Sequence, residues 1–107
     1  MEADIAFARI VQLLGCKWSV QILSFLAEET VRPSELLRQV EGLPARVMHR
    51  CLARMTRDGL VSKTVFASVP PHTEYSLTAD GREFVGLLDT AKHMAGRWTG
   101  TQPPVRL

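Results

Sequence analysis

Glycines and prolines mark the boundaries of four helical patterns in the first 59 residues. Gly15, Gly42 and Gly59 each follow a segment whose apolar residues recur every three or four positions, and glycine is a frequent helix stop. Pro33 and Pro44 can each occupy the first turn of a helix, where the missing N–H group would be unpaired anyway. This punctuation predicts helices over residues 3–14, 17–28, 33–41 and 44–58.

Apolar spacing predicts which sides of the first three helices are buried. The second helix is apolar on two sides, which indicates a central position in the fold. The residues expected to be buried are Phe7, Ile10, Val11 and Leu14 in the first helix, Trp18, Ile22, Phe25 and Leu26 in the second, and Leu36, Leu37 and Val40 in the third.

The third and fourth helices, with the short turn at Gly42, have the layout of a helix-turn-helix. At about 100° per residue, the fourth helix separates its basic residues from its apolar ones. Such a helix can pack on a core while presenting cations at a width that fits the major groove of B-DNA. The predicted inward residues are Met48, Cys51, Leu52 and Met55, and the predicted outward residues are Arg46, His49, Arg50, Ala53 and Arg57.

The positive charge of the chain is concentrated around this fourth helix. The net charge is +4 over residues 44–63, whereas the remainder of the chain is acidic or neutral. This distribution is expected when one element faces a polyanion, and a solvated helix face is the alternative. Arg46 and Arg50 are the strongest candidates to contact a base or a phosphate. Arg57 would bind a phosphate. Arg54 lies to the side of the outward face and would pair within the protein.

A β-hairpin is predicted after the fourth helix. Residues 60–66 and 73–77 have the Val- and Thr-rich or alternating composition of strands. Pro70 and Pro71 lie between them and prevent the loop from continuing the strand ladder. We interpret the hairpin as a wing beside the helix-turn-helix.

The last predicted helix carries a seam for pairing with another helix. Thr78 or Asp80 would cap this helix, and Asp80 with Glu83 fits a capping box. Residues 99–107 are expected to form a flexible tail outside a single domain over residues 1–98. The apolar residues of this seam recur at alternating spacings of four and three positions. They are Phe84, Leu88, Ala91, Ala95 and Trp98.

Length and composition limit the class of protein. The chain has 107 residues, 46% of them hydrophobic and 22% charged, which favours one globular domain and argues against disorder or a coiled-coil rod. The longest uncharged stretch, residues 18–27, is shorter than the roughly 20 apolar residues of a membrane-spanning helix. We therefore expect a cytoplasmic protein, associated with the nucleoid, without a membrane partner.

The sequence contains no recognisable catalytic motif, which predicts that the protein is not an enzyme and needs no cofactor. The histidines and cysteines do not have metal-ligand spacing, so no metal site is expected. Because no export signal precedes them, Cys16 and Cys51 are expected to be reduced rather than joined in a structural disulfide.

Short motifs follow one another in a fixed order along the chain. They are Gly15-Cys16-Lys17-Trp18, Ile22-Leu23, Arg32-Pro33-Ser34-Glu35-Leu36, Arg57-Asp58-Gly59-Leu60-Val61, Val69-Pro70-Pro71, Glu74-Tyr75-Ser76-Leu77-Thr78 with Gly81, and Trp98. Together, over residues 7–98, they resemble the HxlR-type family of bacterial transcriptional regulators within the MarR-like superfamily.

This resemblance implies a mainly α-helical winged helix-turn-helix fold and a homodimer held by the first and last helices. By analogy, Arg32 and Ser34 would approach phosphates, the outward face of residues 44–58 would enter the major groove, and Lys63 and His72 of the hairpin would lie against the backbone or the minor groove. The dimer interface would include Phe7, Ile10, Phe84, Leu88, Ala91, Ala95 and Trp98.

The sequence departs from the family pattern at four positions. Cys16, Pro33, Pro44 and Lys63 stand where the family usually has glycine, phenylalanine, serine and arginine. Loss of the serine cap costs about 1 kcal/mol unless Pro44 offsets it. The usual sensor cysteine near the start of the first helix is missing, so the family's thiol mechanism is not carried over.

Two kinds of residue invite an effector hypothesis. Cys16 lies at a helix start beside Lys17, where a thiolate is favoured, and is a candidate redox sensor; a small packing residue is the alternative. Cys51 is predicted to be a buried, inert thiol. Trp18 and Trp98 either line a ligand pocket or pack in the core and interface.

The functional prediction is a homodimeric regulator, a repressor, that binds a pseudo-palindromic site on double-stranded DNA. Its half-sites would lie about 34 to 36 Å apart, and a small-molecule or redox effector would control it. The alternatives are a winged-helix module for protein interaction and a ligand-binding protein that lacks specific DNA binding.

Overall fold

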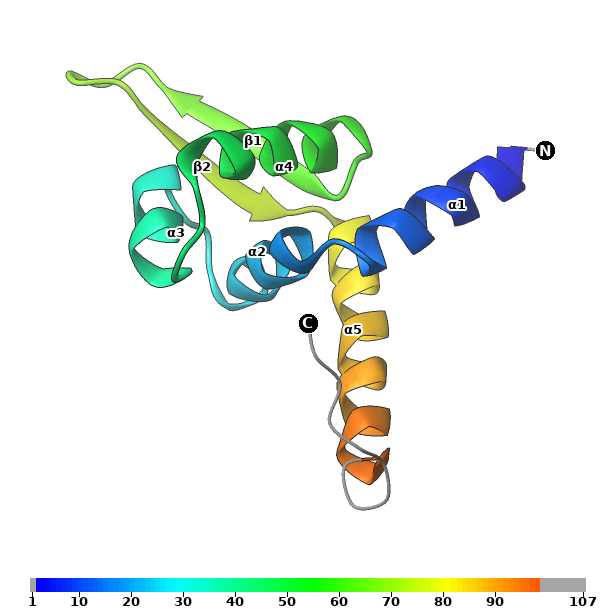
Figure 1. The fold of residues 1–107 in the computed structure, drawn as a ribbon. Helices are drawn as coiled ribbons and strands as arrows, with labels where there is room; N and C mark the ends of the chain where they lie inside the picture. The colour runs from blue at the N-terminus through cyan, green and yellow to red at the C-terminus, as the bar shows by residue number, and fades with distance from the viewer. Residues whose placement is uncertain (1, 99–107) are drawn as a thin grey trace.

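The structure of the protein, a computed structural model, describes residues 2–98; the predicted tail at residues 99–107 lies outside this range. Helices and strands occur in the predicted order (Figure 1). They are α1 (Glu2–Leu14), α2 (Lys17–Glu28), α3 (Pro33–Gln39), α4 (Ala45–Arg57), β1 (Val61–Phe66), β2 (His72–Leu77) and α5 (Ala79–Trp98).

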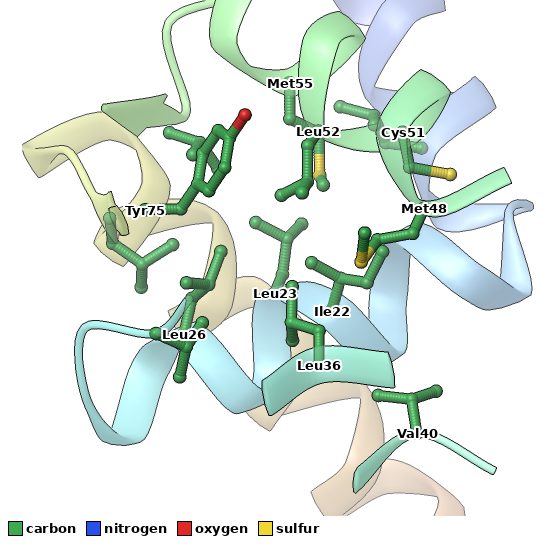
Figure 2. Close-up of a cluster of buried hydrophobic side chains, with 14 of the residues drawn as sticks. Ile22, Leu23, Leu26, Leu36, Val40, Met48, Cys51, Leu52, Met55 and Tyr75 are labelled. Atoms are coloured by element: carbon green, nitrogen blue, oxygen red, sulfur yellow. The ribbon is translucent and has the colours of Figure 1, made fainter. Parts of the chain in front are cut away.

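Helix α2 is the central element of the fold, as its two-sided apolarity predicts. It packs against α1, α4, α5 and β2, and both Ile22 and Leu23 are fully buried. Trp18 and Phe25, which were expected inside, are only half-buried. Figure 2 shows side chains from α2, α3, α4 and β2 converging on one core, in which Leu23 lies near the centre.

The turn between α3 and α4 depends on Gly42. Its φ of +81° lies in the left-handed region that favours glycine, and the Leu43 N–H then donates to the Val40 carbonyl at 3.2 Å. Leu36 and Val40 are buried as predicted, but Leu37 is exposed, so the prediction for Leu37 is wrong. The buried side of this short helix is narrower than its sequence indicates.

The hairpin is antiparallel, with Val61 opposite Leu77 and Phe66 opposite His72. A short bridge extends this two-stranded sheet on its β2 side. The Val31 N–H donates to the Tyr75 carbonyl at 3.0 Å, and the Tyr75 N–H donates to the Val31 carbonyl at 2.8 Å. This bridge, which the sequence analysis does not predict, fastens the base of the wing to the connection between α2 and α3.

Thr78 is the residue that caps α5. Its hydroxyl oxygen accepts a hydrogen bond from the Gly81 N–H at 3.0 Å and donates to the Gly59 carbonyl at 2.6 Å. The alternative cap at Asp80, with Glu83 completing a capping box, is wrong because the helix already begins at Ala79.

Helix α1 and the second half of α5 extend away from the body formed by the other elements (Figure 1). Leu13 is the buried residue of α1, whereas Phe7, Val11 and Leu14 are exposed and Ile10 is partly buried. The predicted burial of that face therefore does not occur within one chain. Among residues 2–98, no single helix is long and apolar enough to span a membrane. Helices α1 and α2 reach the necessary length and hydropathy only when taken together, and they are bent by 89° at the break between them.

Candidate nucleic-acid interface

Helix α4 has two chemically distinct faces, as its sequence predicts. Its apolar residues point into the core, and Met48, Leu52 and Met55 are completely buried. The opposite face is exposed to solvent over the whole length of the helix. The exposed residues of this face, which we call the basic face, are Arg46, His49, Arg50, Ala53 and Arg57.

The start of α4 differs from the prediction by one residue. Pro44 lies at the N-cap rather than inside the first turn, with φ −71° and ψ 140°, and its carbonyl accepts a hydrogen bond from the Met48 N–H at 2.9 Å. The side chain of Pro44 makes no capping hydrogen bond. The backbone N–H groups of the first turn therefore lie open at the positive end of the helix dipole. Because Arg46 is beside them, this end of α4 is a favourable place for an anion.

Arg54 occupies the side of α4, between its two faces. It is partly buried, and its Nη2 atom is buried without a hydrogen-bond partner among residues 2–98. The expected pairing of Arg54 within the protein is therefore not seen at this atom. Arg54 instead lines a cavity of about 470 Å³ together with Arg50 and Arg57, which gives this side of α4 a strongly positive character.

The two candidate phosphate contacts of the preceding helix are both accessible. Arg32 is the N-cap residue of α3, and Ser34 lies in the first turn; both are exposed. The Arg32 N–H donates to the Glu35 carboxylate at 3.1 Å, while the Glu35 N–H donates to the Arg32 carbonyl at 3.0 Å. The Arg32 backbone is thus fixed at the helix start.

The two candidate cations of the wing, Lys63 and His72, differ in their surroundings. Lys63 is exposed on β1. His72 stacks on Phe66 with ring centroids 4.6 Å apart, and its ring nitrogens lie 3.1 Å from the Ser68 hydroxyl and 3.1 Å from the Glu74 carboxylate. Both ring nitrogens are therefore occupied within the hairpin, so His72 orders the base of the loop and does not present a free donor at its tip.

An ion pair connects the basic helix to α1. The Arg9 guanidinium lies 3.7 Å from the carboxylate of Asp58, the C-cap residue of α4. Arg9 is largely exposed, whereas the Asp58 side chain is mostly buried. A carboxylate at a helix C-terminus opposes the helix dipole, and the cation of Arg9 offsets part of this cost.

The predicted interface residues divide into two groups. Phe84 and Leu88 are buried in the core of a single chain, so they are not available on an exposed seam; the prediction for these two residues is corrected. They are buried because the first half of α5 packs on α2 and β2. The predicted residues that remain exposed are Phe7 on α1 and Ala91, Ala95 and Trp98 on α5, with Ile10 partly buried.

The candidate effector residues Cys16 and Trp18 line the same cavity as the arginines of α4. The Lys17 ammonium lies 4.8 Å from the centre of the Trp18 ring, within the range of a cation–π contact. Cys51 is buried on the apolar face of α4, as predicted, and Figure 2 shows its sulfur directed to the side of the core away from Tyr75.

Cys16 and Cys51 lie close enough to affect one another: burial acts to raise the pKa of Cys16, but interactions with Ser19 and Cys51 lower it below its ordinary value. Sequence reasoning treats the two cysteines separately and misses this contact, because they are far apart in the chain and belong to different helical segments. The signals in the sequence were the predicted burial of Cys51 and the alternative of a packing role for Cys16. Among residues 2–98, no group of three or more His, Cys, Asp or Glu side chains could hold a metal ion.

Known proteins resemble this chain in sequence and in structure. The HTH-type transcriptional regulator sll1512 of Synechocystis sp. is 32% identical over 89 residues, which cover 83% of this chain and 66% of that protein. This chain thus spans slightly less than two thirds of that relative. A MarR-family transcriptional regulator from Enterococcus faecalis V583 has a similar solved structure, with a TM-score of 0.81, 28% identity, and coverage of 91% of this chain and 88% of that one.

A second solved structure, the redox regulator HypR in its oxidized form, matches with a TM-score of 0.75 and 25% identity, covering 95% of this chain and 99% of that chain. The arrangement of helices and hairpin confirms the predicted winged helix-turn-helix fold. The sequence profile of the family described as HxlR-like helix-turn-helix matches residues 13–103. The chain therefore belongs to the HxlR-like helix-turn-helix family, whose matched members are transcriptional regulators.

Proposed function

We propose that this protein binds double-stranded DNA sequence-specifically as a homodimer and represses transcription from a pseudo-palindromic operator. The observation that carries the proposal is the basic face of α4. Arg46, His49, Arg50 and Arg57 are all exposed there, while the opposite face of the helix is buried. A helix held rigidly by its apolar side and cationic on its free side suits insertion into a major groove.

The proposed contacts fall into two classes. Arg46 and Arg50 would read base edges or bind phosphates near the start and middle of α4, and Arg57 would bind a phosphate near its end. Arg32 and Ser34 at the start of α3 would bind phosphates, and Lys63 would contact the backbone from the wing. These phosphate contacts would fix the register of α4 on the duplex.

The proposal of a homodimer rests on the exposed apolar residues of the two extended helices. Phe7 is 66% exposed on α1, and Trp98 is 58% exposed at the end of α5. Large apolar side chains that protrude in this way are typical of an interaction surface. A second copy packed along α1 and α5 would cover them and would place the two α4 helices about 34 to 36 Å apart, one turn of DNA.

Control by an effector is part of the same proposal. Cys16 and Trp18 share a cavity with Arg50 and Arg57 of the basic face. A reagent or ligand at this place would therefore act directly on the recognition helix. HypR, one of the structures with a similar fold, is described as a redox regulator, which favours a redox effector.

The test is the fluorescence anisotropy of the duplex upstream of the protein's own gene, measured beside a scrambled duplex over a range of salt concentrations. A sequence-specific DNA-binding protein prefers the upstream duplex and loses affinity steeply with salt, with a slope of about −0.9 for each phosphate that it neutralises. Weak binding that ignores sequence would contradict the proposal and favour a protein-interaction module.

A further inference from the structure

We propose that the cavity beside α4 binds a phosphomonoester with a planar apolar body, and that Arg54 anchors the phosphate group. The cavity is the one that Arg50, Arg54 and Arg57 share with Trp18. The effect of this ligand on transcription rests on the DNA-binding function proposed above. The binding of the ligand itself does not rest on that function.

The first argument is the unpaired guanidinium of Arg54. Its Nη2 atom is buried and has no hydrogen-bond partner among residues 2–98, and the side chain lines the cavity. A buried donor of a charged group without an acceptor costs free energy, and an anion in the cavity would supply the acceptor. The planar fork of a guanidinium matches two oxygens of a phosphate or a carboxylate. The site is therefore suited to an oxyanion.

The second argument is the charge of the cavity. Arg50, Arg54 and Arg57 follow one another at spacings of four and three residues, so they lie on one side of α4. The cavity wall contains no Asp or Glu, and none of the three arginines forms a salt bridge with a carboxylate of residues 2–98. A phosphomonoester carries a charge of about −1.5 to −2 near pH 7, whereas a carboxylate or a DNA phosphodiester carries a single negative charge. Three unpaired cations therefore favour the phosphomonoester.

The third argument is the apolar part of the cavity wall. Trp18 and Cys16 from the start of α2 face Val47 and Ala53 of α4 across the cavity. Its volume of about 470 Å³ is larger than a bare phosphate ion and lies within the range of small-molecule pockets, about 300 to 1,000 Å³. We therefore expect a ligand that places a planar apolar group against Trp18 and its phosphate at Arg54.

A ligand in this cavity would compete with DNA for two arginines. Arg50 and Arg57 belong both to the basic face and to the cavity wall. A bound phosphate group neutralises part of their charge and attracts their guanidinium groups toward the cavity, away from the duplex. The ligand and the operator therefore bind antagonistically, and linkage requires that each weaken the other by the same factor.

Isothermal titration calorimetry of the full-length protein with phenyl phosphate tests the site in the absence of DNA. We expect saturable binding. Inorganic phosphate, which lacks the ring, should bind more weakly, as should benzoate and methyl phenyl phosphate, which each carry a single negative charge. The absence of saturable binding of phenyl phosphate would overturn the proposal. Equal affinity for benzoate would overturn the assignment of a phosphomonoester.

Arg54→Met tests the anchoring residue. Methionine keeps a long side chain without the guanidinium, so the affinity for phenyl phosphate should fall by about 10- to 150-fold, the range for loss of a hydrogen bond to a charged group. The variant should be at least as stable to urea as the wild type, because a buried unpaired donor is removed. Arg38→Met, at an exposed position of α3, is the matched control and should bind normally. Normal binding by the Arg54 variant would contradict the site.

Trp18→Leu separates the apolar contact from the charge. In this variant the affinity should fall for phenyl phosphate and remain unchanged for inorganic phosphate, since the arginines of the cavity are retained. Circular dichroism checks that the variant is folded. An unchanged affinity for phenyl phosphate would overturn the placement of the ring against Trp18.

The regulatory step is tested by the anisotropy of the upstream duplex at constant ionic strength. Saturating phenyl phosphate should weaken duplex binding by about 5- to 150-fold, the usual range of coupling between two sites. Benzoate at the same concentration should have no such effect, and neither should phenyl phosphate on Arg54→Met. Binding of phenyl phosphate that leaves the duplex affinity unchanged would overturn the antagonism. If the protein binds no duplex at all, the proposed function fails, while calorimetry still decides the ligand site.

Discussion

Gly81 in the first turn of α5 packs directly against the carbonyl group of Leu60, and a Cβ atom at this position would overlap the Leu60 oxygen. The same oxygen accepts a hydrogen bond from the Thr78 N–H at 3.0 Å. The start of α5 is therefore fixed against the start of the hairpin. Since α5 carries part of the proposed dimer interface and the hairpin follows α4, this contact sets how the interface lies relative to the recognition helix.

The first prediction concerns this close approach. Gly81→Ala should lower the free energy of unfolding by about 1 to 3 kcal/mol, because backbone must move to admit the methyl group. The matched control is Gly86→Ala in the same helix, where a Cβ would meet nothing within 4 Å. This control should be stabilising by about 0.5 to 1 kcal/mol, since alanine favours the helix. Urea denaturation that gives both variants the same stability would contradict the packing.

The second prediction concerns the cap of α5. Thr78→Ala removes the acceptor for the Gly81 N–H and the donor to the Gly59 carbonyl. It should lower the free energy of unfolding by about 1 to 2 kcal/mol. Thr90→Ala is the control, because that hydroxyl is exposed and bonds only a carbonyl of its own helix. Thermal unfolding should separate the two variants clearly. Equal unfolding temperatures would show that Thr78 does not cap the helix.

The fold is predictable from the sequence where local chemistry decides it. The two faces of α4 follow from the 3.6-residue period, because Met48 and Arg50 cannot point the same way on one helix. The helix boundary at Gly42 follows from the backbone preference of glycine, whose φ is positive in the structure. These features need no knowledge of the remaining chain.

Features that depend on tertiary packing are not predictable in the same way. The periodicity of α1 predicts that Phe7 is buried, yet Phe7 is exposed and Leu13 is buried. The reason is that only the end of α1 packs against the other elements. The spacing of α5 marks Phe84 as part of a seam, but its position on α2 and β2 makes it a core residue. The contact between Cys16 and Cys51 likewise requires the packing of α2 against α4.

The third prediction concerns the pH dependence of thiol reactivity. The thiolate is the reacting species, and the pKa of Cys16 is lowered, so its alkylation by iodoacetamide should reach half-maximal rate at a lower pH than that of free cysteine. The pKa of Cys51 is raised, so Cys51 should react only at higher pH. Mass spectrometry of peptides at a series of pH values measures both profiles.

Cys51→Ala provides the control for this profile, because it removes a hydrogen bond that lowers the pKa of Cys16. The midpoint for Cys16 should therefore move to higher pH in this variant. A midpoint that stays in place would refute the influence of Cys51 on Cys16, and a wild-type Cys16 that titrates like free cysteine would refute its lowered pKa.

The fourth prediction concerns the dimer. Phe7→Ser should shift the protein toward monomer in sedimentation equilibrium without loss of folded structure, because Phe7 is 66% exposed within one chain. Leu37→Ser is the matched control, since Leu37 is also an exposed apolar residue but lies on α3, outside the two extended helices. We expect this control to remain dimeric. A Phe7 variant as dimeric as the wild type would place the interface elsewhere.

The most direct test of the account is the affinity of the upstream duplex for Arg46→Ala and Arg50→Ala, each compared with wild type and with the control Arg82→Ala. Arg82 is an exposed arginine of α5, outside the basic face. An arginine that reads a base should cost about 1 to 3 kcal/mol of specific binding when removed, and one that binds a phosphate should weaken all duplexes alike and reduce the salt slope by about 1. Wild-type affinity in both α4 variants would contradict insertion of α4 into the major groove.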